Sequence, residues 1–258
     1  MTGNYVNAKK SLGQHFLKDQ NIARKIVSAL TPCHALQVLE VGPGMGILTR
    51  FLMEMPGVTL KVIEIDPESI HFLKANFPGI DPSIIQDNFL TADITGLFTG
   101  SFALIGNFPY NISSQIFFKI IGNRDWIPEV VGMVQKEVAE RICHGPGSKT
   151  YGILSVLLQA FYRIEYLFTV GESVFNPPPK VKSAVIRLTR NETEHLECDE
   201  ALFFRVVKTA FNQRRKMLGN SLKSLGYRVP EEFASLRAEQ LSVAQFVSLT
   251  AMLGRQTS

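Results

Sequence analysis

The sequence predicts an α/β protein built on a doubly wound parallel sheet, followed by a smaller helical region. Three observations indicate this fold. Short apolar segments alternate with segments of helical periodicity up to Cys143, which is typical of parallel strands joined by crossover helices. A glycine-rich turn follows the first of these apolar segments. The stretch from Asp199 to Gly254 shows helical periodicity alone.

The predicted elements follow in order along the chain. Apolar positions at helical spacing predict a first helix within 19–30, and a short apolar run predicts the first strand at 37–41. A second strand is expected at 59–63, and the next helix begins at Pro67, because proline is favoured in the first turn of a helix. The remaining expected elements are strands at 83–86, 102–106 and 130–135, helices at 46–55, 113–121 and 137–143, and two late strands at 161–170 and 181–188. The late strands, joined by a proline-rich turn, are expected to form an antiparallel hairpin at one edge of the sheet.

A change in composition after Arg190 marks the predicted domain border. The polar stretch Asn191–His195 is typical of a linker, and the chain of 258 residues fits one large domain with a small appendage better than two equal domains. We therefore expect a first domain over 1–190 and a small all-α domain over 191–258.

Composition limits the class of protein. The chain is 45% hydrophobic and 19% charged, which is ordinary for a globular protein, and no apolar run reaches the roughly 20 residues of a membrane helix. Residues 1–20 are polar and basic, without the apolar stretch of a signal peptide. Cys33, Cys143 and Cys198 form neither a zinc pattern nor a disulfide framework. We expect a cytoplasmic monomer with no membrane partner and no metal, and the net charge of +4 is compatible with a polyanionic partner.

A cofactor site is predicted at the ends of the first three strands. The first strand runs into Glu40-Val41-Gly42-Pro43-Gly44-Met45-Gly46, whose glycines allow a ligand to approach the backbone closely. A dinucleotide fingerprint would need a further glycine where Ile47 stands. Glu64 ends the second strand and could accept both ribose hydroxyls, while Asp87 follows the third and could contact an adenine. A ribose, an adenine and an amino acid without a diphosphate describe S-adenosylmethionine. The alternative, a tight turn with two solvated acids, leaves the coincidence of two acids at successive strand ends without an explanation.

A catalytic motif is predicted after the fourth strand, in Asn107-Phe108-Pro109-Tyr110. An adenine amine is a poor nucleophile, because its lone pair is delocalised into the ring. The amide oxygen of Asn107 and the carbonyl of Phe108 could accept both amine hydrogens and stabilise the charge that develops on nitrogen. Pro109 would hold that carbonyl in place, and Tyr110 would stack on the extruded base. The alternative is a strand-ending turn, since Asn and Pro are common turn residues.

Several short motifs, taken in order, carry a family resemblance. They are Gln14-His15-Phe16-Leu17, Glu40-Val41-Gly42-Pro43-Gly44, Glu64-Ile65-Asp66, Asn107-Phe108-Pro109-Tyr110-Asn111-Ile112-Ser113, Gln135-Lys136-Glu137-Val138-Ala139, Tyr151-Gly152-Ile153-Leu154-Ser155, Phe175-Asn176-Pro177-Pro178-Pro179-Lys180-Val181 and Phe211-Asn212-Gln213-Arg214-Arg215-Lys216. The set resembles the KsgA-type ribosomal RNA adenine dimethyltransferases and spans nearly the whole chain. The resemblance implies a Rossmann-like class I S-adenosylmethionine methyltransferase sheet of seven strands, the last one antiparallel, with a small helical domain. It also implies dimethylation of two adjacent adenosines in a hairpin near the 3′ end of small-subunit rRNA, on a pre-formed subunit particle, as part of small-subunit biogenesis.

The same resemblance implies particular site residues. The cofactor contacts it implies are His15, Leu17, Gly42, Glu64, Asp87 and Asn107. His15 stands where many relatives carry Asn, and Phe108 stands where Leu is usual. Because the backbone carbonyl of Phe108 does the proposed work, we expect activity to survive this difference, with a changed pocket shape.

Basic residues supply candidate RNA contacts. They are Lys9, Lys10 and Lys180 near the expected mouth of the active site, and Arg214, Arg215 and Lys216 on a predicted helical stretch of the last domain. Neutralisation of phosphates by such residues would make the affinity depend on salt. The alternative is a solvated helical face without a partner.

Three competing functions share part of this pattern. An Erm-type large-subunit rRNA adenine methyltransferase has the same cofactor motifs and a similar tetrapeptide, but the Phe211–Lys216 run and the Asn111-Ile112-Ser113 context favour the small-subunit interpretation. A non-catalytic ribosome assembly factor would keep the fold without turnover. A DNA adenine methyltransferase would use related acceptor chemistry and would not explain the remaining motifs.

Overall fold

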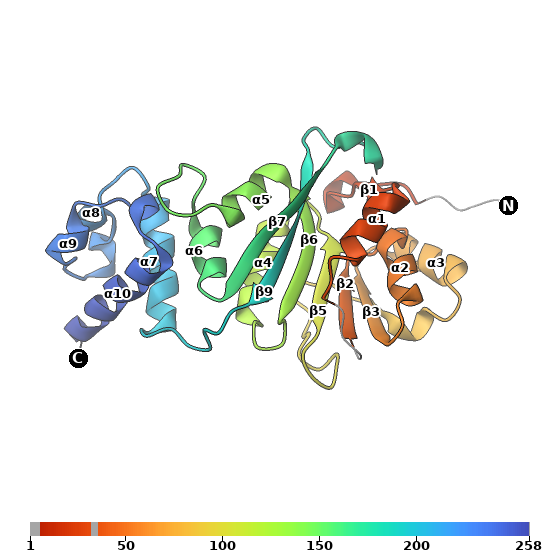
Figure 1. Ribbon diagram of the computed structural model, residues 1–258, viewed down its shortest axis with the longest axis horizontal. Coiled ribbons are helices and arrows are strands. Elements are labelled where there is room, and N and C mark those ends of the chain that lie inside the picture. The colour runs from red at the N-terminus through yellow and green to blue at the C-terminus, as the bar shows by residue number, and fades with distance from the viewer. Residues whose placement is uncertain (1–5, 32–35, 258) are drawn as a thin grey trace. The chain divides into compact units, whose positions relative to one another are not determined.

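The computed structural model describes residues 6–31 and 36–257, and the chain forms two compact units (Figure 1). The first, the sheet unit, comprises the chain up to Ala139 together with Glu165–Thr189. The second, the helical unit, comprises Glu140–Ile164 and the chain from Arg190 onward. The domain border expected after residue 190 coincides with the start of the second stretch of the helical unit, at Arg190. Residues 140–164, expected in the first domain, group with the helices.

A seven-stranded sheet forms the centre of the sheet unit, with the order β4-β3-β2-β5-β6-β9-β7. The strands are β2 (Leu36–Val41), β3 (Val58–Glu64), β4 (Ile84–Gln86), β5 (Ala103–Asn107), β6 (Glu129–Gln135), β7 (Tyr162–Val170) and β9 (Ser183–Arg190). β2 pairs in parallel with β3 on one side and with β5 on the other, so the strand order reverses between β2 and β5. In doubly wound sheets, ligands bind at the carboxyl ends of the strands beside such a reversal.

The two late strands close one edge of this sheet. β9 lies between β6 and β7, and it runs antiparallel to β6, with Ser183 opposite Gln135. The predicted antiparallel end of a seven-stranded sheet is therefore confirmed. The pairing also fixes Ser183, the first residue of β9, close to the end of β6.

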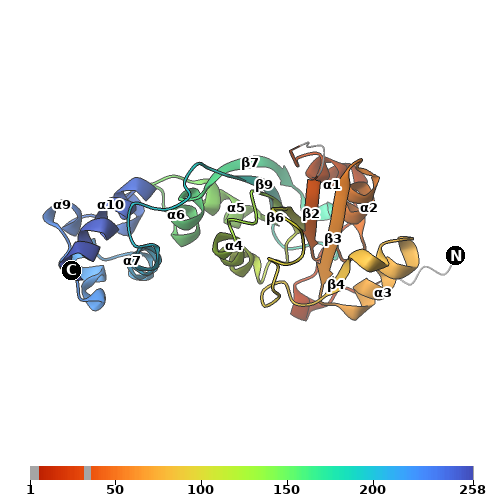
Figure 2. The same ribbon diagram turned by 90° about the horizontal axis from the view of Figure 1, so that it is seen from below.

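Helices cover both faces of the sheet (Figures 1 and 2). α1 (Gln20–Val27), α2 (Ile47–Glu54) and α3 (Pro67–Asn76) share a core with one face, whereas α4 (Ser113–Gly122) lies on the opposite face, and α5 (Lys136–Cys143) follows β6. Asp19 caps α1 by accepting from the N–H groups of Asn21 and Ile22. Asp66 caps α3, whose first residue is Pro67 as predicted. An acidic cap and a proline in the first turn both favour helix initiation.

A second, two-stranded sheet was not predicted. β1 (Phe16–Leu17) pairs antiparallel with β8 (Phe175–Asn176). The 3-10 turn Lys10–Leu12 precedes β1, and Pro177 directly follows β8. This pairing ties residues 9–15, hereafter the N-terminal lead-in, to the proline-rich turn.

The helical unit contains α6 (Ile153–Gln159), α7 (Glu200–Asn212), α8 (Leu218–Ser221), α9 (Glu231–Ala234) and α10 (Val243–Gly254). Its core includes the buried rings of Tyr151, Phe203, Phe211 and Phe246. The Phe211 ring centroid lies 6.0 Å from that of Tyr151 and 5.9 Å from that of Phe246. Phe203, Val207 and Phe211 are thus core residues of the helical unit.

Other parts of the chain complete the description. Further 3-10 turns are Asp81–Ser83, Glu172–Val174, Lys223–Leu225, Ala238–Gln240 and Arg255–Thr257. None of the described helices is long and apolar enough to cross a membrane. Cys143 and Cys198 are free thiols, and Cys33 lies outside the described residues.

Candidate active site

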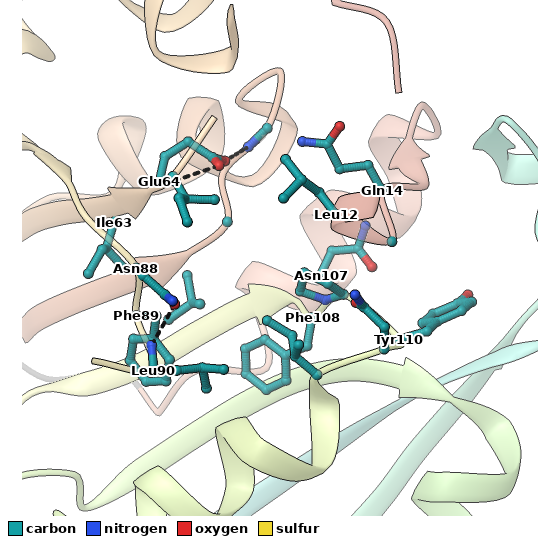
Figure 3. Close-up of a pocket in the computed structure, with 18 of the residues that line it drawn as sticks. Leu12, Gln14, Ile63, Glu64, Asn88, Phe89, Leu90, Asn107, Phe108 and Tyr110 are labelled. Atoms are coloured by element: carbon teal, nitrogen blue, oxygen red, sulfur yellow. Dashed lines mark hydrogen bonds between the residues drawn. The ribbon is translucent and has the colours of Figure 1, made fainter. Parts of the chain in front are cut away.

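A cavity in the sheet unit collects most of the predicted site residues (Figure 3). It lies where β2, β3, β4 and β5 end, and the N-terminal lead-in forms part of its wall. The predicted residues that line it are His15, Gly42, Glu64, Asp87, Asn107, Phe108, Pro109 and Tyr110. In Figure 3, Glu64 and Asn88 lie on one side of the cavity, and Asn107 and Tyr110 lie on the other. Leu17 instead lines a smaller neighbouring hollow, together with Gly42, Gly44 and Asn107.

Glu64 is held rigidly at the end of β3. Its side chain is buried, and its two oxygens accept hydrogen bonds from the N–H groups of Gly44 (3.2 Å), Ile65 (2.9 Å) and Asp66 (2.9 Å). Burial raises the pKa of the Glu64 carboxyl above its ordinary value, and the three N–H bonds offset part of that rise. A carboxylate fixed in this way is preorganised to accept hydrogen bonds from a ribose diol.

The predicted glycine-rich turn follows β2, and its three glycines have left-handed backbone conformations. Gly42, Gly44 and Gly46 all have positive φ angles, of 67°, 55° and 75°. A Cβ atom on Gly44 would lie 2.8 Å from the Phe16 ring, whereas the space beside Gly42 is open. Gly44 is therefore required for the packing of Phe16 in β1, and Gly42 leaves room for a ligand beside the backbone.

The far end of the cavity suits a purine. Asp87 is exposed there, and its Oδ1 accepts from the Asn88 N–H at 2.6 Å, while the Asn88 Oδ1 accepts from the Leu90 N–H at 3.0 Å. Ile65 is 47% exposed and lines the cavity, so an apolar ring bound there would cover it. Ile65, Asn88 and Leu90 were not assigned from the sequence. Their only signal was their position next to the acidic strand ends.

Asn107 is oriented by the lead-in. Its Nδ2 donates a hydrogen bond of 2.9 Å to the backbone carbonyl of His15. With the nitrogen turned toward His15, the amide oxygen is the end of the side chain that remains available as an acceptor in the cavity. The catalytic assignment of Asn107 therefore has a physical basis that the sequence could not supply.

Phe108 lines the cavity, and its ring packs against β5, β6 and α4. The ring is buried, packs edge-on against Phe117 at 6.0 Å, and fills a slot over Gly106 and Gly132. A Cβ on Gly132 would lie 2.5 Å from the Phe108 ring. The Phe108 N–H donates to the carbonyl of Met133, which anchors the peptide at the end of β5. The two glycines explain how phenylalanine fits at this position.

Tyr110 is held from two sides. Its hydroxyl lies 2.5 Å from the hydroxyl of Ser183, and its ring centroid lies 5.3 Å from that of His15 at an angle of 31°. The Nδ1 of His15 lies 2.8 Å from the carbonyl oxygen of Pro177; because that carbonyl can only accept, the nitrogen is the donor. Burial raises the pKa of the Tyr110 phenol, so the hydroxyl stays protonated.

Polar contacts connect the lead-in to the start of α3. Lys9 Nζ lies 2.6 Å from Asp66 Oδ1 and 3.0 Å from Glu68 Oε1, and Gln14 Nε2 donates to Asp66 Oδ2 at 3.2 Å. Burial alone would raise the pKa of Asp66, but the bonds from Lys9, Gln14, Ser69 and the backbone outweigh it and lower that pKa. Lys9, predicted to contact RNA, is thus engaged in closing the cavity wall.

The other candidate RNA-binding residues lie in different settings. Lys10 and Lys180 are exposed in the sheet unit. Arg214, Arg215 and Lys216 lie in the turn between α7 and α8, so the expectation that they belong to a helix was wrong. Arg214 is half-buried, donates to the Ser148 carbonyl at 3.2 Å, and approaches Glu239 at 3.6 Å. Arg215 and Lys216 are exposed.

The strand order, the glycine turn, the ribose-type carboxylate and the amide at the end of β5 together define a class I S-adenosylmethionine-dependent methyltransferase. The residues present fit that cofactor: an open backbone at Gly42, fixed acceptors at Glu64 and an apolar face at Ile65. Within this class, the chain belongs to the ribosomal RNA adenine dimethylase family, whose model matches residues 5–253.

Individual relatives agree with this family. A protein of Parabacteroides distasonis named ribosomal RNA small subunit methyltransferase A is 59% identical over 249 residues, which cover 95% of this chain and 93% of that protein. Proteins of the same name from Bacteroides thetaiotaomicron and Flavobacterium johnsoniae are 58% and 57% identical, over 95% of this chain and 93% and 95% of their own lengths.

Solved structures are similar over nearly the whole chain. A dimethyladenosine transferase from Plasmodium falciparum superposes with a TM-score of 0.78 at 25% identity, covering 94% of this chain and 98% of that chain. The 23S rRNA methyltransferase ErmE superposes with a TM-score of 0.70 at 26% identity, covering 93% and 99%.

Proposed function

We propose that this protein transfers methyl groups from S-adenosylmethionine to the exocyclic amines of two adjacent adenosines in a 3′-terminal hairpin of small-subunit rRNA, giving dimethyladenosine. The names of its relatives, at up to 59% identity over nearly the full chain, support the small-subunit substrate. The observation that carries the chemistry is the hydrogen bond from Asn107 Nδ2 to the His15 carbonyl, because it leaves the amide oxygen as an acceptor for the amine.

The catalytic motif at the end of β5 would act on the amine, while Gly42, Glu64 and Ile65 would hold the methyl donor. S-adenosylmethionine supplies an electrophilic methyl group, so no base is needed before transfer. The Asn107 oxygen and the Phe108 carbonyl would accept the amine hydrogens, draw the nitrogen toward tetrahedral geometry, and stabilise its positive charge as the new bond forms. Tyr110 would stack on the extruded base. The methylated ammonium then loses a proton, which restores a neutral amine.

The exposed cations of both units would bind the RNA phosphates. We assign this role to Lys10 and Lys180 in the sheet unit and to Arg215 and Lys216 in the helical unit, all of which are exposed. Arg214, which contacts Ser148 and Glu239, would hold the turn in place, and Lys9 would hold the lead-in. In this proposal the enzyme acts as a monomer in the cytoplasm, on an assembled small subunit.

The direct test is transfer of radiolabelled methyl from S-adenosylmethionine to purified, unmodified small ribosomal subunits. We expect label in the small subunit, recovered as dimethyladenosine after digestion, and its loss by a factor of about 10²–10³ with Asn107→Ala, as for removal of one preorganised group that stabilises developing charge.

Two parallel samples make this test decisive. Large subunits are the control for a resistance-type activity like that of ErmE, and label found only there would replace the proposal. Tight binding of small subunits without any transfer would instead favour an assembly factor that has lost turnover.

A further inference from the structure

The hydroxyl of Tyr110 has a buried and rigid partner that the proposed chemistry does not use. Ser183 Oγ lies 2.5 Å from Tyr110 Oη, and the Ser183 side chain has no exposed surface. Ser183 begins β9 and lies opposite Gln135 in the ladder with β6. Because strand pairing fixes its backbone, the serine hydroxyl holds a defined position beside Tyr110, which lines the cavity.

The ring of Tyr110 is also supported along its side. His15 packs against it with centroids 5.3 Å apart, and the His15 ring is itself fixed by its bond to the Pro177 carbonyl. The β1–β8 pair brings His15 and Pro177 together, since Phe16 lies opposite Asn176. A tyrosine side chain has two rotatable bonds; a hydrogen bond at its hydroxyl end and a ring at its side restrict both.

We infer that Ser183 is a positioning residue for methyl transfer, which holds Tyr110 in the orientation in which the target adenine stacks on its ring. This inference rests on the proposed function. An extruded adenine has lost the stacking of its RNA neighbours, and a ring that is already fixed replaces that stacking without a further loss of conformational freedom. Ser183 would not touch the base; it acts through Tyr110.

Because the reaction transfers two methyl groups, the role of Ser183 can be recognised from the ratio of the two products. Two methyl groups must reach the same nitrogen, and after the first transfer only one amine hydrogen is left for the acceptors Asn107 and Phe108. The base is then held less by hydrogen bonds and more by stacking. A loosened Tyr110 should therefore impair the second transfer more than the first, and the share of monomethyladenosine should rise.

The experiment uses Ser183→Ala, Ser183→Thr, Tyr110→Phe and the double variant Ser183→Ala/Tyr110→Phe, assayed on unmodified small subunits. We expect Ser183→Ala to lower kcat about tenfold, the loss typical of one hydrogen bond, with cofactor Kd unchanged and a raised ratio of monomethyl to dimethyl product by nucleoside mass spectrometry. Tyr110→Phe should give the same loss, and the double variant should be no worse than either single variant, because both remove one interaction. Ser183→Thr keeps the hydroxyl and should restore most of the rate.

A matched control separates positioning from general stability. Ser155 is also fully buried, donates to the Arg141 carbonyl, and belongs to the helical unit. Ser155→Ala should lower the melting temperature without changing the product ratio. Additive losses in the double variant, or an unchanged product ratio in Ser183→Ala, would overturn the inference. A wild-type protein that transfers no methyl to small subunits would instead refute the proposed function itself.

Discussion

At the scale of single residues, two buried carboxyl groups near the cavity, Glu64 and Glu40, differ in their hydrogen-bond donors. Glu64 has three backbone N–H donors. Glu40, 1% exposed in β2, has one hydroxyl donor, Thr49, at 2.7 Å. Burial, with a smaller contribution from the charge of Glu64, raises the pKa of Glu40 to about 8. Glu40 is therefore largely protonated at neutral pH, whereas the three N–H donors of Glu64 offset part of the rise that burial gives to its pKa.

This difference predicts a pH-dependent stability. The pKa of Glu40 in the folded protein lies above its unfolded value of 4.5. Its contribution to the free energy of unfolding is therefore complete below about pH 4.5 and is lost as the pH rises toward 8. Glu40→Gln removes this titration. Between pH 4.5 and 8, the unfolding free energy of the wild type should therefore fall relative to that of the variant, by an amount of the order of a few kcal/mol. Urea unfolding of the cofactor-free protein at several pH values measures this, with the exposed Glu54→Gln as control. Parallel curves for Glu40→Gln and wild type would contradict it.

Some residues of the site could be predicted from the sequence, and others could not. Glu64, Asp87 and Asn107 were predicted because each follows an apolar strand, and parallel strands bring their carboxyl ends to one edge. Nothing in the local pattern distinguishes Glu40 as a protonated group, because its pKa depends on burial by distant segments. Ser183 was likewise beyond prediction, since its role depends on β9 lying beside β6.

At the scale of elements, β5 and β6 form a slot for one side chain. Gly106 in β5 and Gly132 in β6 leave the space that the Phe108 ring occupies. The ring is fully enclosed, and the same residue supplies the carbonyl proposed to face the amine. The packing between two strands thereby determines where a proposed catalytic oxygen lies.

Gly132→Ala tests this coupling. The added methyl would lie 2.5 Å from the Phe108 ring, so we expect a loss of about 1–3 kcal/mol in unfolding free energy and a reduced rate of methyl transfer. Phe108→Leu in the same background has a smaller side chain and should recover part of both. Urea unfolding and initial rates measure the two effects. If Phe108→Leu brings no recovery, the slot does not control the carbonyl.

The elements differ in how far they could be predicted. β2, β3, β5 and β6 were expected within one or two residues, because each is a short segment rich in apolar, mostly β-branched or leucine, residues. The pairing of β1 with β8 was missed, since two-residue strands have no periodicity and their partners are far apart in the sequence. α6 was missed because Ile153–Gln159 is apolar on nearly all sides and has no amphipathic pattern.

At the scale of the whole molecule, charge is unevenly divided between the units. The helical unit contains 13 of the 27 basic and 9 of the 23 acidic residues, and so accounts for the net charge of +4, while the sheet unit is neutral. A neutral catalytic unit and a basic helical unit are consistent with binding of the RNA backbone mainly through the latter.

Charge reversal in the helical unit should therefore weaken RNA binding selectively. Arg215→Glu/Lys216→Glu changes two exposed cations and spares Arg214, which contacts Ser148 and Glu239. We expect weaker binding to small subunits, a dependence on salt that is shallower by about 0.7–0.9 in log–log slope for each phosphate that is no longer neutralised, and an unchanged cofactor Kd. Lys61→Glu/Lys74→Glu makes the same change of charge in the sheet unit and should have a smaller effect. Equal effects of the two pairs would contradict this assignment.

The helical unit is built from two separate stretches of the chain, and this affects how it is made. α6, in the first stretch, packs against α7 and α10 in the second, and Tyr151 contacts Phe211. During synthesis, residues 140–164 leave the ribosome long before their packing partners exist. The apolar side chains of α6 lack part of their cover until α7 and α10 have been translated, and during this interval the nascent chain exposes apolar surface to chaperones and to aggregation.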